Sequence, residues 1–225
     1  MKPRQTLPTM TPRIKSLPVD ERGYPVPWFV QWFDNGIPGA WGVGKPDFRV
    51  VDERKKRIAI VQKRCWICGG LLGRHMAFVI GPMCAINRVS SEPPSHRDCA
   101  VFAATGCPFL AMPKMHRREE GIPAGVIDAP GVALDRNPGV AMVWMASSYK
   151  LAAANGGNDG VLFRFGDPSD ILFFCEGRKA TLAEVMHSID TGLPALQAAA
   201  RSEGTEKELD VCYREAKVLV EAHCR

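Results

Sequence analysis

Four side chains that could bind a metal ion occur as two pairs, each with two residues between its members. Cys65 and Cys68 form the first pair, within CWICGG, and His96 and Cys99 form the second. Structural zinc sites take four thiolate or imidazole ligands from the protein in a tetrahedron. Two cysteines three apart can face one ion in a tight turn, and positions i and i+3 share one face of a helix. We therefore expect a structural Zn²⁺ site at these four residues.

Three further donors lie close enough in the sequence to compete for a place in this site. Cys84, Cys107 or His75 could replace His96 or form a second partial site, and Cys84 follows a Gly-Pro pair that could turn it inward. A redox CxxC motif is another alternative, but it should open a helix, whereas glycines follow Cys68. A chance collection of buried cysteines is the remaining one.

The elements predicted around the ligands place the second pair at the start of a helix. Ser95 is a natural N-cap and Asp98 completes a capping-box pattern, so a helix is expected to run to Gly106, with Pro108 preventing continuation. Upstream, residues 49–51 and 57–61 predict a hairpin with DERKK at its tip, and residues 71–80 contain a second hairpin. We call the turn at Cys65–Gly70 the knuckle. Knuckle, hairpin and the helix that bears the second pair follow one another as in a treble clef, which we expect over residues 63–107.

The same region resembles an uncharacterised group of bacterial and phage-encoded proteins that share a CxxCGG knuckle and a PPSHxxCA helix start. The matching stretches here are CWICGG and PPSHRDCA, and the resemblance covers residues 46–118. It implies a shared zinc-binding core at the four ligand positions and no particular activity. The treble-clef class as a whole includes binders, nucleases and structural modules, so architecture does not decide the function.

Basic residues crowd the predicted hairpin and knuckle, a pattern that often contacts phosphates in small zinc modules. Residues 1–118 contain 19 Lys+Arg and 8 Asp+Glu, a net charge of +11, whereas residues 119–225 contain 10 and 16, a net −6, which sum to the overall +5. This asymmetry indicates an anionic partner or attraction between the halves; a hydrated basic face is the alternative. The candidate nucleic-acid-binding residues are Lys55, Lys56, Arg57, Lys63, Arg64 and Arg74, which Lys114, Arg117 and Arg118 could extend.

Two motifs match nucleotide-binding or catalytic patterns only in part. Residues 39–45 match GxxxxGK of a phosphate-binding loop, but Pro46 replaces the required Ser or Thr and a strand is predicted to follow. His75, Asn87 and His96 occur in the order of an HNH nuclease, but no acidic residue adjoins His75 and His96 is used for zinc. We predict no catalytic residue and no nucleotide cofactor, and expect a binding protein rather than an enzyme.

The whole chain predicts an α+β fold in three parts. Residues 1–22 are proline-rich and predict a flexible basic arm, residues 23–118 the basic zinc-binding domain, and residues 119–225 an acidic α+β domain with a small antiparallel sheet and C-terminal helices. The aromatic run at 28–33 is predicted mainly as core. In the last part, residues 140–146 predict a buried strand, and residues 161–165 and 171–175 a hairpin around GDPSD. Two T-x-x-E capping boxes, at Thr181 and Thr205, begin the helices.

Composition and targeting signals favour a soluble cytoplasmic protein. The apolar fraction is 46% and the charged fraction 24%, as in ordinary globular domains. The first residues do not read as a secretory signal, and no apolar run is long enough to span a bilayer. We expect a zinc-stabilised binding protein whose likeliest partner is nucleic acid. The alternatives are a protein–protein interaction module, in a phage–host setting, and an HNH-like metal-dependent nuclease.

Overall fold

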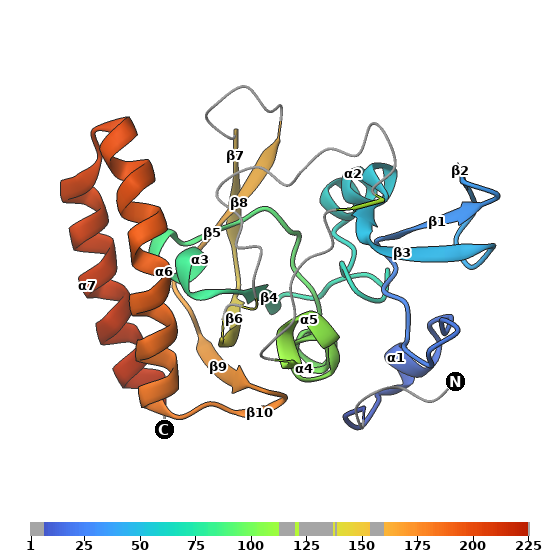
Figure 1. The fold of residues 1–225 in the computed structure, drawn as a ribbon, viewed down its shortest axis with the longest axis horizontal. Coiled ribbons are helices and arrows are strands. Elements are labelled where there is room, and N and C mark those ends of the chain that lie inside the picture. The colour runs from blue at the N-terminus through green and yellow to red at the C-terminus, as the bar shows by residue number, and fades with distance from the viewer. Residues whose placement is uncertain (1–6, 113–119, 122–136, 138, 154–159, 225) are drawn as a thin grey trace.

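The computed structural model of the chain describes residues 7–112, 120–121, 137, 139–153 and 160–224 (Figure 1). These segments form three antiparallel sheets, with the two longest helices at the C-terminal end. The predicted combination of small antiparallel sheets and C-terminal helices is therefore confirmed. Among the described helices, none has both the length and the apolar character that a bilayer crossing needs.

The first sheet lies beside the N-terminal segment and leads into a capped helix. Its elements and their neighbours are α1 (Pro12–Lys15), β1 (Val30–Asp34), β2 (Ile37–Pro38), β3 (Lys45–Val51) and α2 (Glu53–Gln62). The strands run in the order β2-β1-β3. The carboxylate of Asp52 accepts a hydrogen bond from the backbone N–H of Arg54, which satisfies one of the unpaired donors at the start of α2. The helix ends at Lys63, whose φ is 50°.

The hairpin predicted from residues 49–51 and 57–61 is wrong, because the second of these segments belongs to α2. β3 pairs with β1 instead. DERKK looks like the charged tip of a hairpin, but Asp52 is a strong N-cap and the following Glu, Arg and Lys residues are good helix formers. The local chemistry therefore favours a helix, although its apolar periodicity is weak.

The central sheet carries the helix that bears the second ligand pair. Its strands, in the order β10-β9-β6-β4, are β4 (Met76–Ile80), β6 (Ala141–Ala146), β9 (Asp170–Cys175) and β10 (Arg178–Lys179). Every residue of β6 is buried, which confirms the predicted strand at 140–146. Alternate residues serve opposite faces: Val143 clusters with Ala100 and Ala104 of α4 (Arg97–Gly106), whereas Trp144 belongs to the larger core.

The larger core lies among the central sheet, a third sheet and the C-terminal helices. The remaining elements are α3 (Pro82–Asn87), β5 (Val89–Ser90), α5 (Pro108–Ala111), β7 (Tyr149–Ala153), β8 (Val161–Phe165), α6 (Leu182–Glu203) and α7 (Glu206–His223). α6 and α7 pack side by side at one end of the molecule (Figure 1). The capping box of Thr181 and Glu184 is confirmed, whereas Thr205 caps α7 without the predicted side-chain hydrogen bond. The apolar stripe of α7 packs into this core.

Residues 161–165 and 171–175 form strands as predicted, but they do not pair with each other. β8 lies between β5 and β7 in the third sheet, whereas β9 lies between β10 and β6 in the central sheet. Alternating side chains identify a strand but not its partner. The turn between them therefore passes the chain from one sheet to another.

The predicted division into residues 1–22, 23–118 and 119–225 differs from the described structure at two places. Ile14 and Leu17 lie in the segment expected to be a flexible arm, yet they are 0% and 5% exposed. The expected boundary near residue 118 separates β4 from β6, although these strands pair from Met76↔Ala146 to Ile80↔Met142. Residues 113–119, with Lys114, Arg117 and Arg118, lie outside the described ranges. The two halves thus share a sheet and a core.

Candidate metal centre

A tight backbone turn brings the first two cysteines together. The backbone N–H of Cys65 donates to the carbonyl of Gly70 at 2.7 Å, and that of Gly69 donates to the carbonyl of Cys65 at 2.8 Å. Arg64 and Leu71 form an isolated antiparallel bridge on either side of this turn. Gly69 has a φ of +71°, and a Cβ there would lie 2.8 Å from the Trp28 ring, so only glycine fits. The knuckle therefore has the shape that its CWICGG sequence predicts.

The second pair lies at the start of α4, and a backbone bridge fixes this start beside the central sheet. Ser95 exchanges hydrogen bonds of 2.8 and 2.9 Å with Ala77 of β4. The N-cap is His96 rather than the predicted Ser95, and it makes no side-chain capping bond. Asp98 forms an ion pair with Arg13 at 3.1 Å and not the predicted capping box. The predicted helix is confirmed, with His96 as the N-cap of α4 and Cys99 in its first turn.

The four predicted ligands converge on one point. The donor atoms of Cys65, Cys68, His96 and Cys99 all lie within 4.8 Å of one another. His96 Nδ1 lies 3.4 Å from Cys68 Sγ and 3.9 Å from Cys99 Sγ. Tetrahedral zinc, with bonds of about 2.3 Å to sulfur and about 2.0 Å to nitrogen, would separate its ligand atoms by roughly 3.5–3.8 Å. The arrangement thus suits a metal ion of this size, and the donor set suits zinc.

The imidazole of His96 is oriented by a backbone carbonyl. Its Nε2 lies 2.9 Å from the carbonyl oxygen of Leu71, which can only accept a hydrogen bond. We therefore assign the proton to Nε2, which leaves the lone pair of Nδ1 directed at the sulfur atoms. Metal-binding histidines commonly donate their second ring nitrogen to a carbonyl in this way. Both nitrogens of His96 are then engaged.

The sulfur atoms lie in a polarised pocket with apolar walls. Backbone N–H groups of Cys68 and His96 each donate to Cys65 Sγ at 3.4 Å. Hydrogen bonds from the Cys68 and Cys99 thiols, and from these amides, hold the pKa of Cys65 well below its usual range. Proximity to Cys65 in turn raises the pKa of Cys68 and of Cys99. Three thiolates cannot coexist here without a cation, because they would repel one another.

The alternative ligands do not belong to this group of donor atoms. Cys84 lies within α3, and Cys107 is the residue at which α4 ends. His75 is exposed and precedes β4. Within the described ranges, the four predicted residues are the histidine, cysteine and carboxylate side chains that come close enough to share one ion. This grouping favours His96 over Cys84, Cys107 and His75 as the fourth donor.

The candidate nucleic-acid-binding residues are not all exposed, as they would be if they lay on the predicted hairpin. Arg57, Lys63 and Arg74 are exposed, whereas Lys56 and Arg64 are half-buried. Arg64 donates to the carbonyl of Gly69 at 2.9 Å and so closes the knuckle. The prediction that Lys55 contacts nucleic acid is wrong, because only 8% of its surface is exposed and the residue is part of the interior.

The sequence singled out Lys55 as a surface cation but did not reveal its interior contacts with two tryptophans. Its ammonium lies 5.8 Å from the ring centres of both Trp28 and Trp41. Asp52 Oδ2 lies 3.8 Å from Nζ, and the carbonyl of Val30 lies 3.5 Å away. Burial lowers the pKa of Lys55 to about 8, even though the charge of Asp52 acts to raise it. The inward orientation of Lys55 depends on residues 53–62 forming a helix, whereas the sequence predicted a hairpin tip there.

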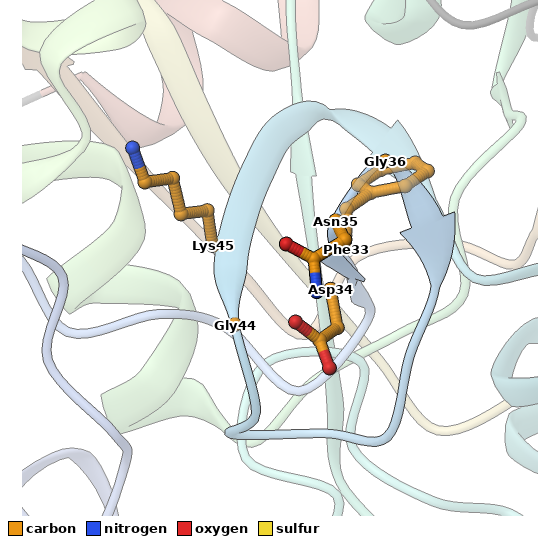
Figure 2. A pocket seen from close by; sticks show the side chains of 6 residues that line it. All are labelled: Phe33, Asp34, Asn35, Gly36, Gly44 and Lys45. Atoms are coloured by element: carbon orange, nitrogen blue, oxygen red, sulfur yellow. The ribbon is translucent and has the colours of Figure 1, made fainter.

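The glycine-rich stretch at 35–46 forms a surface hollow and no phosphate-binding loop. Figure 2 shows the lining of this hollow, with Lys45 extending away from the turn at Asn35 and Gly36. A Cβ on Gly44 would lie 2.2 Å from the carbonyl oxygen of Phe33, so this glycine serves the close approach of two strands. Strand β3 follows, and not the helix whose amides would bind a phosphate.

The described residues give the nuclease alternative little support. Asn87 ends α3, a helix that packs against α6 and α7, whereas His75 precedes β4. His96 directs one ring nitrogen at sulfur atoms and the other at a carbonyl, so it has no nitrogen left for a catalytic metal.

Comparison with known proteins gives no family model, no curated protein and no solved structure that matches this chain. The resemblance to CxxCGG and PPSHxxCA proteins therefore stays an expectation from the sequence.

Proposed function

We propose that this chain is a zinc-stabilised binding protein that contacts nucleic acid through its basic N-terminal half and acts in the cytoplasm. The observation that carries the proposal is a set of exposed cations on α2 and on either side of the Cys65–Gly70 turn: Arg57, Lys63 and Arg74. They lie in a half whose net charge is +11. Thiolate ligands that must stay reduced suit a reducing compartment.

Zinc has a structural role in this proposal. Four protein ligands leave no open coordination position for a substrate, which is typical of structural rather than catalytic sites. The order of knuckle, strand β4 and ligand-bearing α4 supports a treble-clef-like module, in which Ala77 and Ser95 pair across an insertion of α3 and β5. The ion would join the knuckle to α4 and so fix the surface on which the cations lie.

The cations are positioned to meet a phosphate backbone. Lys63 lies at the end of α2, two residues before Cys65, and Arg74 lies four residues after Gly70. Arg57 is exposed on α2 itself. Exposed lysine and arginine side chains bind phosphates mainly by releasing counterions, which gives affinity without sequence preference. We therefore expect binding that depends strongly on salt and weakly on sequence.

The test is fluorescence anisotropy of the zinc-loaded protein with labelled oligonucleotides across a salt series. We expect log Kobs to fall linearly with log salt concentration. The triple variant Arg57→Gln, Lys63→Gln, Arg74→Gln should bind more weakly, and its salt slope should be smaller in magnitude by about 2–3, because each phosphate contact contributes about 0.7–0.9.

A control variant removes the same charge from the other half of the chain. Lys150→Gln, Arg164→Gln, Lys179→Gln neutralises three exposed cations far along the sequence. It should leave the salt slope close to that of the wild type. Absence of binding to any oligonucleotide at low salt would reject the proposal, and equal losses in the two triple variants would assign binding to net charge alone.

Exposed valines on α7 favour a second candidate, a protein-interaction module. Val211 and Val218 are 46% and 65% exposed, and their seven-residue spacing puts them on one side of the helix. They lie in the half of net charge −6. A partner protein with an apolar, basic surface would fit, in a phage–host setting or elsewhere. Its binding should persist at salt concentrations that abolish nucleic-acid binding.

A further inference from the structure

The hairpin beside the metal centre exposes apolar side chains that the core does not use. Between β1 and β3, Ile37, Trp41 and Val43 are 70%, 41% and 51% exposed. Each side chain is large enough to gain free energy from burial. The tryptophan would gain the most, because it has the largest side-chain area of the three. Such a group on one short segment points to a contact with another molecule.

This segment is held in a defined shape. The backbone N–H of Gly39 donates to the carbonyl of Trp32 at 2.8 Å, and that of Val43 donates to the carbonyl of Ala40 at 3.1 Å. The close approach of Gly44 to Phe33 fixes the return of the chain to β3. The exposed side chains are therefore presented by an ordered turn, which lowers the entropy lost on binding.

Lys55 connects this turn to the metal centre. Its ammonium lies over the rings of both Trp41 and Trp28, 5.8 Å from each centre. Trp28 in turn packs against Gly69 of the knuckle and donates its backbone N–H to Ile67 at 2.7 Å. A cation over an indole ring is attracted to its π face. Trp41 is thus oriented from inside the protein while much of its surface stays exposed.

We propose that Trp41 stacks on unpaired bases, so that the nucleic acid recognised is single-stranded. This inference rests on the proposed function and names its substrate class. Exposed Lys45, four residues from Trp41 on the same hairpin, supplies charge for the adjoining phosphates. Aromatic platforms beside basic side chains are the usual means of binding single strands, because every base offers a π face. In a duplex these faces are covered by neighbouring base pairs.

The test compares strands that differ only in their bases. The zinc-loaded full chain is titrated with a labelled single strand of DNA, the same strand of RNA, an abasic strand of equal length and a duplex, all at one salt concentration. We expect the base-containing strands to bind about tenfold more tightly than the abasic strand, from stacking on one indole. The affinities for the DNA and RNA strands should differ less from each other than either differs from the affinity for the abasic strand.

Three variants locate this preference. Trp41→Ala should bind base-containing and abasic strands equally, with abasic binding unchanged from the wild type, whereas Trp41→Phe should keep most of the preference. Val43→Ala, on the same turn, should change it by less than about twofold. Zinc content and thermal midpoint are measured for each variant, because Trp41 also contacts Lys55.

The outcomes separate the inference from the function on which it rests. Equal binding of base-containing and abasic strands by the wild type, tighter binding of the duplex, or an unchanged preference in Trp41→Ala would overturn the stacking role while leaving phosphate binding intact. No binding of any strand would overturn both.

Discussion

At the scale of single residues, the candidate metal centre gathers three cysteine sulfur atoms whose thiolates would repel one another without a cation. Cys65 and Cys99 are fully buried among Ile14, Leu17 and Ile67. Two backbone amides already favour a thiolate at Cys65. A second and third thiolate in these apolar surroundings would be costly, and a divalent ion removes that cost. Metal binding and folding of this region should therefore be coupled.

Replacing one ligand tests this coupling. Cys99→Ser should lose stoichiometric zinc and lower the free energy of unfolding by more than about 3 kcal/mol, because structural zinc contributes folding energy directly. Cys84→Ser is the matched control, since Cys84 lies outside the donor group, and it should keep one zinc per chain. Zinc content by mass spectrometry and denaturant unfolding give the two readings. A full zinc complement in Cys99→Ser would contradict the assignment.

Spacing alone was enough to predict which four donor side chains come together, because each pair is set by a local turn. The tautomer of His96 could not be predicted in this way, since it depends on the carbonyl of Leu71, twenty-five residues away. The burial of Lys55 was missed for the same kind of reason. It results from Trp28 and Trp41, which approach α2 from other parts of the chain.

At the scale of elements, the N-terminal segment acts as a cover for the metal centre. Ile14 of α1 and Leu17 join the apolar cluster that contains Cys65 and Cys99. Arg13 pairs with Asp98 in the first turn of α4, and Pro8 lies against Gly106 at the end of that helix. The surface ion pair contributes little by itself. The cover is therefore held mainly by the buried isoleucine and leucine.

The cover predicts a difference between two aliphatic truncations in the same segment. Ile14→Ala removes a side chain that is 0% exposed and should cost about 2–4 kcal/mol. It should also speed the transfer of zinc to a chelator. Val19→Ala, at a position 58% exposed, should change stability by less than about 0.5 kcal/mol. Denaturant unfolding and stopped-flow zinc transfer provide the measurements; equal behaviour of the two variants would argue against a packed cover.

Elements were predicted best where one strong local signal marked them, either a capping box or a continuous apolar run. α6 begins at the predicted capping box, and β6 is the predicted buried strand. The errors arose where charged residues concealed a helix, as in α2, or where a turn connected strands of different sheets, as between β8 and β9. The proline-rich start of the chain predicted flexibility, but three apolar residues, Met10, Ile14 and Leu17, suffice to dock it. Which strand pairs with which, and where a segment docks, depends on residues far apart in the chain, so a local sequence pattern does not predict it.

At the scale of the whole molecule, the basic and acidic halves are joined by the central sheet. β4 comes from the first half and pairs with β6 of the second. α4 then packs on the same sheet through Ala100 and Ala104, next to Val143. The opening turn of this helix carries His96 and Cys99. The geometry of the metal centre therefore depends on a strand that lies more than forty residues further along the chain.

This dependence predicts that a destabilising change in β6 also lowers the stability of the candidate metal centre. Val143→Ala, at a position 0% exposed, should lower the free energy of unfolding by about 2 kcal/mol through the cavity it leaves. Cobalt-loaded protein allows the metal centre to be followed by its absorption while circular dichroism follows the helices. Both signals should shift together to lower denaturant, as in one cooperative unit. Val218→Ala, the same truncation at a position 65% exposed on α7, should shift neither. If Val143→Ala moved the helical signal and left the cobalt signal in place, the metal centre would be an independent domain, as the sequence had suggested.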